Sequence, residues 1–179
     1  MTIEKLGSGS PVQFLTLQDL YRHLRITPVD ENDIENDELS DLVKGCYISA
    51  VSTVETILSK SLDPVLFRQT DCGYTIELDE ANVKKESIVV KEGNVTLVKD
   101  IDYKVIVNRE TTLLEFTKNR TVTVDFECGY TSDTIPATYL RAIIMLTAEM
   151  FEMPSGGKEL RSGVYTAVER LLMPTRRFS

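Results

Sequence analysis

The stretch that decides the fold of this chain runs from Ile135 to Glu152, with the sequence Ile-Pro-Ala-Thr-Tyr-Leu-Arg-Ala-Ile-Ile-Met-Leu-Thr-Ala-Glu-Met-Phe-Glu. Pro136 suits the first helical position, because a proline there gives up no hydrogen bond. Pro154 and the Gly156-Gly157 pair stop the run after about five turns, roughly 27 Å. The stretch therefore predicts a helix over residues 136–153.

This helix is apolar around most of its circumference. One stripe has the spacing of a core-facing surface and contains Leu140, Ile143, Ile144, Thr147 and Phe151. Other apolar residues continue around the cylinder, among them Met145, Leu146 and Met150. A central core helix explains this pattern most simply. The alternative is that Met145, Leu146 and Met150 contact another subunit.

Composition and charge exclude several classes of protein. The 179 residues suit one domain, or one domain with an inserted subdomain, and 42% hydrophobic with 27% charged residues is ordinary for a soluble globular protein. The net charge of -8 argues against a nucleic-acid-binding protein, because such a protein gains affinity by neutralising phosphates with Lys and Arg. No apolar run reaches the length of a membrane span, and the N-terminus lacks the pattern of a signal peptide, so we expect synthesis in a cytoplasm.

Two helices precede the central part of the chain. Thr16 with Asp19 is a variant of the capping box, and it begins a short amphipathic helix over residues 16–26. A longer helix over residues 37–62 has its apolar residues on one stripe and ends before Asp63-Pro64.

A run of acids precedes the longer helix: Asp30, Glu31, Asp33, Glu35, Asp37 and Glu38. Acids are favoured at helix N-termini for electrostatic reasons, so the run is typical of a helix start. The alternative, a metal or catalytic cluster, finds no support in a calcium-loop spacing.

From Val65 to Tyr130 the hydrophobic period changes from about 3.6 to two. The pattern predicts strands over residues 65–70, 74–78, 87–90, 95–98, 103–107, 112–117 and 121–128. Two hairpin turns are expected, at Glu92-Gly93-Asn94 and at Lys118-Asn119-Arg120. We therefore expect an antiparallel β insert over residues 65–130.

The two ends of the chain are expected to lie outside the packed domain. Residues 1–14 have the composition of a flexible lead. A final helix over residues 163–172 is followed by an extended tail, residues 173–179. From Lys158 onward five basic and two acidic residues give a charge of 5 - 2 = +3, which favours a docking role for this end.

Sequence motifs of catalysis or of metal and cofactor binding are missing. His23, the single histidine, lies between Arg22 and Arg25 with no nucleophile at a recognisable spacing. The cysteines, Cys46, Cys72 and Cys128, are too widely spaced to indicate a zinc site or a disulfide framework. We expect a protein that is not an enzyme and that needs no cofactor.

The order of these segments resembles that of the phage head-tail connector (adaptor) proteins of the gp6-like and gp15-like group. The resemblance covers almost the whole domain. It rests on Leu15 to Ile26, the acidic run before a long helix, Asp102-Tyr103-Lys104-Val105, Gly129-Tyr130, Ile135-Pro136 with Leu140 to Leu146, and Leu171 to Arg176.

The predicted helices (16–26, 37–62, 136–153 and 163–172) and the β insert together give an α+β fold, a small bundle of four helices with an inserted antiparallel β subdomain. The resemblance implies that this fold assembles into a ring that is commonly dodecameric. Members of this group are virion proteins of the neck. The ring lies beneath the portal protein, extends the channel through which genomic DNA passes, and offers a surface to neck, stopper or tail-completion proteins. The strand insert is larger here than in the minimal members of the group.

The resemblance also implies that the C-terminal tail docks into the portal. The residues at that position are Arg170, Leu172, Met173, Pro174, Thr175, Arg176, Arg177 and Phe178. Arginines would pair with portal acids while the apolar members fill grooves. Two alternatives stay open: a small metal-dependent hydrolase that uses the acids of residues 30–38, and a generic monomeric interaction module.

Overall fold

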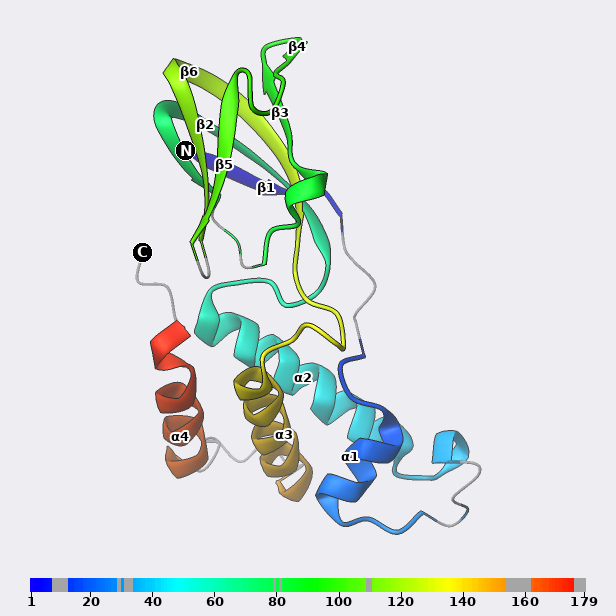
Figure 1. Ribbon diagram of the computed structural model, residues 1–179. Coiled ribbons are helices and arrows are strands. Elements are labelled where there is room, and N and C mark those ends of the chain that lie inside the picture. Colours follow the sequence, from blue (N-terminus) through cyan, green and yellow to red (C-terminus); the bar gives the residue numbers. More distant parts are fainter. Residues whose placement is uncertain are drawn as a thin grey trace. The chain divides into compact units, whose positions relative to one another are not determined.

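The computed structural model describes residues 1–7, 13–28, 30, 34–78, 80, 82–108, 111–153 and 162–175. Within these ranges the chain has four α-helices and a six-stranded antiparallel sheet, which confirms the α+β fold class (Figure 1). The chain divides into two compact units, a sheet unit (residues 1–12 and 61–131) and a helical unit (residues 13–60 and 132–179). In the described part of the chain no helix is long and apolar enough to cross a membrane.

The helical unit contains α1 (Leu17–Leu24), α2 (Ser40–Leu58), α3 (Ala137–Glu152) and α4 (Ser162–Leu172), with 3-10 helices η1 (Ile34–Asn36) and η3 (Met173–Thr175). Helix α3 packs against α2 and α4, as the central helix of the unit. Helix α2 is shorter than the expected range of 37–62, because Ser59 adopts a left-handed backbone conformation that ends it.

The predicted capping box at the start of α1 is confirmed. The Thr16 hydroxyl oxygen accepts a hydrogen bond from the Asp19 backbone N–H at 3.1 Å, and the Asp19 carboxylate accepts one from the Thr16 hydroxyl at 2.6 Å. The bond from the Thr16 hydroxyl lowers the pKa of Asp19. Local chemistry therefore fixes the beginning of this helix.

One acid of the run before α2 helps to position the start of that helix. The Asp37 carboxylate accepts hydrogen bonds from the Leu39 backbone N–H and from the Tyr21 hydroxyl, each at 3.0 Å. Burial, with the Asp37 bond as the second cause, raises the pKa of Tyr21 to about 12. Asp37 therefore acts as expected for an acid at the start of a helix, and its hydrogen bond with Tyr21 connects α1 to the start of α2.

The sheet unit contains β1 (Thr2–Lys5), β2 (Val65–Leu78), β3 (Val89–Glu92), β4 (Val95–Thr96), β5 (Tyr103–Asn108) and β6 (Thr111–Cys128), with a 3-10 helix η2 (Lys85–Ser87). The strand order is β1-β2-β6-β3-β4, and β5 also pairs with β6. The predicted turn at Glu92-Gly93-Asn94 is confirmed, because it joins β3 to β4.

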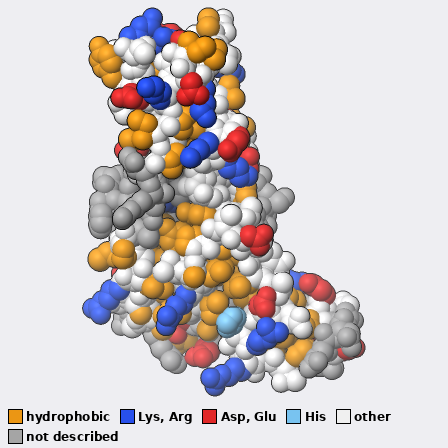
Figure 2. All heavy atoms as spheres, in the orientation of Figure 1, with side chains coloured by type: hydrophobic (Ala, Val, Ile, Leu, Met, Phe, Trp, Pro, Cys, Tyr) orange, Lys and Arg blue, Asp and Glu red, His pale blue; other side chains and the backbone are white. Residues whose placement is uncertain are grey.

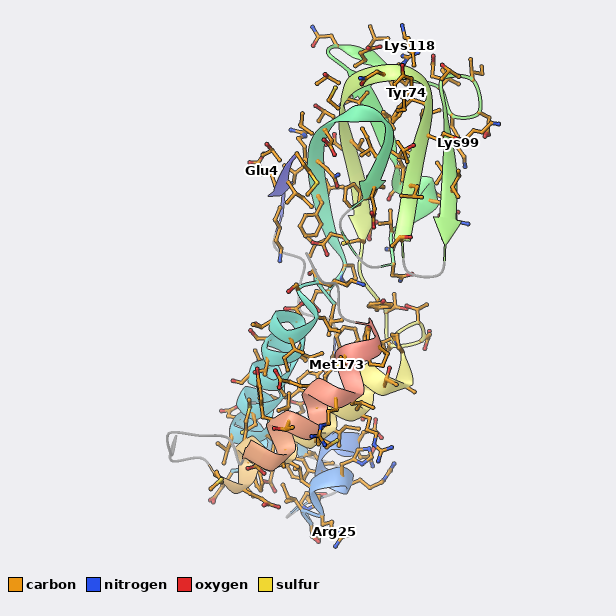
Figure 3. All side chains as sticks on the ribbon, turned by 90° about the vertical axis from the view of Figure 1, so that its left-hand side faces the viewer. Glu4, Arg25, Tyr74, Lys99, Lys118 and Met173 are labelled. Carbon is orange, nitrogen blue, oxygen red and sulfur yellow. The ribbon has the colours of Figure 1, made fainter. Side chains whose placement is uncertain are left out.

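Strands β2 and β6 are much longer than predicted, and both fold over at the same end of the unit. Their pairing runs from Val65↔Cys128 to Gly73↔Arg120 and resumes at Thr75↔Glu115, so that the register shifts at the bend. Figure 3 shows Tyr74 of β2 and Lys118 of β6 together at this end. The expected turn at Lys118-Asn119-Arg120 was wrong, since these residues lie inside β6, which stays paired with β2 on both sides of the bend.

Folding the sheet over encloses a hydrophobic core between its two halves. Val122, Val124, Phe126 and Cys128 share one buried face of β6, as the alternation predicted. The buried residues of the other half include Ile76, Leu78, Leu114 and Phe116. Phe67 stacks on Phe126 with ring centroids 6.1 Å apart.

The expected flexible lead was wrong for residues 2–5. These residues form β1, which pairs with β2 in the register Thr2↔Thr70 to Lys5↔Phe67. All four side chains are exposed, so backbone hydrogen bonds hold the strand. Four residues without a buried side carry no hydrophobic pattern, and their partner lies more than 60 positions away in the sequence.

The pairing of β2 with β6 includes a cross-strand ion pair. Arg68 and Asp125 are register partners, and the guanidinium donates two hydrogen bonds, Nε to Oδ1 at 2.7 Å and Nη2 to Oδ2 at 3.0 Å. The Arg68 side chain thereby lowers the pKa of Asp125 below its ordinary value of 3.8. Such a two-bond geometry is stronger than a single surface contact.

We expect Asp125→Asn to lower the free energy of unfolding by about 1 kcal/mol at pH 7. Because the folded-state pKa is lowered, the stabilisation is complete above about pH 4 and is lost as the pH falls through the folded pKa, so the variant should lose less stability in acid than the wild type. Chemical denaturation at pH 7 and pH 3 measures both effects. Glu115→Gln is the control, since no described residue forms an ion pair with Glu115; an equal loss in both variants would contradict the assignment.

Candidate interaction surfaces

No metal centre forms among the described residues. In those ranges no three His, Cys, Asp or Glu side chains gather closely enough to hold a metal ion. Of the acidic run, Glu35 pairs with Lys44, Asp37 holds α1 and α2 together, and Glu31 and Asp33 lie outside the described residues. The exposed features that could contact a partner are the C-terminal end, helices α2 and α3, and the apolar segments of the sheet unit.

The C-terminal end departs from the expected extended tail. Leu172 is fully buried in the helical unit, and Met173 to Thr175 form the 3-10 helix η3. Arg170, Met173 and Pro174 are exposed, Met173 by 54%. The expected tail residues Arg176, Arg177 and Phe178 lie outside the described residues. Leu172 continues the apolar stripe of α4 and therefore packs in the core of its own unit. The prediction that Leu172 contacts the portal was wrong, because its side chain is buried.

Helix α3 was expected to contribute Met145, Leu146 and Met150 to a subunit contact. Leu146 is fully buried within the chain, so it cannot form such a contact. Met145 and Met150 are partly exposed, Met150 on the side of the helix that also carries Leu146. Figure 2 shows hydrophobic side chains gathered on the surface of the helical unit around α3.

The outward surface of α2 is uncharged over most of its length. Between Leu42 and Thr56 the exposed residues are Leu42, Gly45, Ile48, Ser49, Ser52 and Thr56. Ile48 is 58% exposed and Leu42 is 39% exposed. The solvent-facing side of a helix is ordinarily charged or polar, so the exposed Ile48 and Leu42 make this side of α2 a candidate contact surface. Sequence analysis missed this surface, because it becomes visible only when the buried side of α2 is known.

The sheet unit exposes apolar residues beside the bend. Val95 of β4 is 64% exposed, and Val98 and Ile101 in the segment that follows are 53% and 75% exposed. A small cavity of about 230 Å³ adjoins them, lined in part by Ile101, Tyr103 and Phe116. Pockets for small organic ligands are generally about 300–1,000 Å³, so this cavity suits a single side chain better than a cofactor.

A buried arginine connects these exposed segments to the bend. The Arg120 side chain is only 9% exposed, and Nη1 donates to Glu92 Oε2 at 2.9 Å while Nη2 donates to Asp102 Oδ1 at 3.3 Å. Its Nε is buried and has no hydrogen-bond partner among the described residues. The sequence pattern could have indicated that Arg120 is buried. Side chains alternate between the two faces of a strand, so Arg120 lies on the same face of β6 as the buried Val122 and Val124.

Comparison with known proteins shows a shared fold along the whole chain. No protein-family model and no curated protein matches the sequence. The structure is similar to a chain in the neck of an empty GTA particle computed with C6 symmetry, with 17% identity and a TM-score of 0.68. It is also similar to chains in the virion of a native gene transfer agent (GTA) particle (18%, 0.66) and in the neck of the native particle computed with C12 symmetry (14%, 0.64). Each likeness covers 100% of this chain and 97% of the other.

Proposed function

We propose that this chain is a structural neck protein of a phage-like particle, in which identical copies form a ring between head and tail. The observation that supports this proposal most is the likeness to neck chains of GTA particles, since it covers both units from end to end. Those necks were computed with C6 and C12 symmetry. A ring of six or twelve identical copies requires two different, mutually complementary surfaces on each copy.

The finer role that we propose is that of a head-tail connector of the gp6-like and gp15-like group. In this role the ring docks beneath the portal, extends the DNA channel and receives the next neck or tail protein. The net charge of -8 supports a conduit role, because an acidic protein repels DNA and does not retain it. The docking end would be Arg170, Met173, Pro174, Thr175, Arg176, Arg177 and Phe178.

The alternative of a metal-dependent hydrolase has no observation in its favour. Of the described acids of residues 30–38, Asp37 accepts a hydrogen bond at the start of helix α2 and Glu35 pairs with Lys44. Calorimetric titration with magnesium, manganese or calcium tests that alternative directly. A heat of saturable binding with any of these ions would support it.

The test of the proposed function is the mass of the purified protein, alone and mixed with its portal, by native mass spectrometry. We expect a ring-sized species in at least one sample. The same measurement on a variant that lacks residues 173–179 should show a folded protein that no longer joins the portal, because the deletion removes the exposed Met173 and Pro174 with the residues that follow them and keeps the buried Leu172.

The control for the truncation is Arg25→Asp, which reverses an exposed basic residue elsewhere in the helical unit. It should leave portal binding unchanged. A full-length protein that stays monomeric and ignores the portal would overturn the connector function. Unimpaired portal binding by the truncated protein would overturn only the docking role of this end.

A further inference from the structure

Strand β5 is an edge of the folded sheet. Among the described strands it pairs with β6 alone, in an unbroken register over residues 103–108. Its other side is occupied at the beginning, where Lys99 bridges Tyr103 and the Asp100 backbone N–H donates to the Tyr103 carbonyl oxygen at 2.8 Å. Figure 3 shows Lys99, next to this edge, on the side of the sheet unit opposite Glu4 of β1.

The hydrogen bond to Tyr103 identifies the backbone groups of β5 that point away from β6. In an antiparallel pair the N–H and C=O of one residue point to the same side, and successive residues alternate between the two sides. Because the Tyr103 carbonyl points away from β6, the N–H and C=O groups of Val105 and Val107 also lie at the free edge. Lys104 and Ile106 form the ladder with β6. The free edge therefore offers two donors and two acceptors to a further strand.

The side chains along this edge are apolar. Val105, Ile106 and Val107 follow one another in the sequence, and Ile106 and Val107 are 38% and 40% exposed. Because side chains alternate along a strand, an exposed apolar side chain lies on each face of the sheet at this edge. An exposed, regular and apolar edge is a template for another strand.

The other edges of the sheet are protected. Beside the second half of β2, the buried Gln69 side chain donates to the Glu77 carbonyl oxygen at 2.8 Å, so a side chain satisfies the backbone there. Strand β1 carries the charged Glu4 and Lys5, and β4 has two residues. Charged side chains and short strands are common ways in which proteins block edge pairing. Strand β5 has a charge at Lys104 but neither charge nor proline in the three residues that follow.

A cavity lies beside the start of the same edge. It has a volume of about 230 Å³, and its lining includes Tyr103 and Lys104 of β5 and Glu115 and Phe116 of β6. One end of a strand added along β5 would lie next to this cavity, which has room for a single side chain. The edge thus offers backbone hydrogen bonds for affinity and a side-chain pocket for specificity.

We propose that the free edge of β5 binds an extended segment of another protein of the particle, which joins the sheet as a further strand. This inference rests on the proposed function, because it names the kind of partner that the sheet unit of a neck protein receives. The segment exchanges backbone hydrogen bonds with Val105 and Val107 and packs apolar side chains against Ile106 and Val107. Two copies joined edge to edge through β5 would form a two-fold dimer, which does not build a ring, so the partner is a different polypeptide.

The first test identifies the partner by crosslinking. Ile106 is replaced with the photo-crosslinking residue benzoylphenylalanine, and particles that contain the variant are purified and irradiated. Side chains of neighbouring strands lie about 5 Å apart, so we expect a crosslink from position 106 to a different polypeptide, located by mass spectrometry. The same replacement at Glu4, on the edge formed by β1, is the control and should give at least tenfold less crosslink to other polypeptides.

The second test removes one hydrogen bond at the edge. Val107→Pro deletes an N–H that the ladder with β6 does not use, so the protein should stay folded by far-ultraviolet circular dichroism. Combined with the crosslinker at position 106, it should lower the crosslink yield at least tenfold. Val107→Ala is the matched control, because it shortens the side chain but keeps the N–H, and it should retain the crosslink.

The outcomes separate this inference from the proposed function. If the chain is absent from purified particles, the neck function fails. If the chain is present but position 106 crosslinks no more than position 4, or crosslinks to further copies of this chain alone, the neck function stands and the partner at β5 is overturned. Equal crosslinking in Val107→Pro and Val107→Ala would overturn strand addition as the mode of binding.

Discussion

Gly129→Ala should destabilise the sheet unit by about 3 kcal/mol, because the added methyl group has no room and the backbone conformation disfavours it. Gly129 follows the last residue of β6 and has a φ of +106°. A Cβ atom at this position would lie 2.3 Å from the Asp63 carbonyl oxygen and 2.7 Å from the Pro64 nitrogen. Both contacts are with backbone, so no side chain can rotate away to relieve them.

The close approach at Gly129 is part of a hydrogen-bonded junction at the base of the sheet unit. The Tyr130 backbone N–H donates to the Leu62 carbonyl oxygen at 2.8 Å, and the Asn82 side chain donates to the Gly129 carbonyl oxygen at 2.7 Å. The start of β2 and the end of β6 are thereby held together next to the positions where the chain enters and leaves the unit. A shift of the backbone here would disturb the pairing of the two longest strands.

Gly93→Ala is the matched control for this substitution. Gly93 also has a positive φ, +61°, but a Cβ atom there meets nothing within 4 Å in the described part of the chain. We expect it to cost about 1 kcal/mol, the effect of the backbone conformation alone. Hydrogen exchange of the β2 and β6 amides and chemical denaturation followed by circular dichroism measure both variants. If Gly129→Ala lowers the free energy of unfolding no more than Gly93→Ala does, the backbone relaxes around the added methyl group. The close approach of Gly129 to the Asp63 and Pro64 backbone would then contribute nothing to the cost of the substitution.

The sequence predicted best those elements whose determinants are local. Thr16 and Asp19 fix the start of α1 by hydrogen bonds within one turn, and the alternation from Val122 to Cys128 fixes the buried face of β6. The pairing of β1 with β2 and the bend of β2 and β6 could not be read in this way. They depend on partners far away in the sequence, and the exposed residues around Lys118 resemble a turn whether the strand ends or only bends.

The candidate surfaces were predictable to a similar degree. The apolar circumference of the 136–153 helix correctly drew attention to α3, but periodicity alone could not separate the buried Leu146 from the partly exposed Met145, its neighbour in the sequence. The tail prediction assigned Leu172 to a partner, whereas it completes the core of the helical unit. In both cases an apolar residue that was assigned to a contact with a partner packs in the core of its own chain. Its burial becomes visible only when the packing of the neighbouring helices is known.

Arg120→Met should lower the free energy of unfolding of the sheet unit by about 2 kcal/mol, although methionine keeps much of the apolar volume. The substitution leaves the Glu92 and Asp102 carboxylates without their shared guanidinium. Among the described residues, the Asp102 carboxylate would keep its hydrogen bond from the Val98 backbone N–H, at 2.9 Å. The loss stays below that of a fully buried ion pair because the Glu92 and Asp102 side chains are 41% and 29% exposed, so water solvates them in part.

The local loss of stability in Arg120→Met should be largest in the segments that Arg120 joins. Glu92 ends β3 just before the hairpin turn, and Asp102 precedes β5, so Arg120 holds the exposed Val95, Val98 and Ile101 to the bend of β6. We therefore expect faster hydrogen exchange in the β3–β4 hairpin and in residues 97–102 than in the first half of β2. Lys118→Met, on the same bend but exposed, is the control and should change neither exchange nor stability. If Arg120→Met matches that control, the buried guanidinium contributes no net stability, and the order of the exposed apolar segments must come from the aromatic core beneath them, where Tyr103 and Phe116 lie 6.0 Å apart.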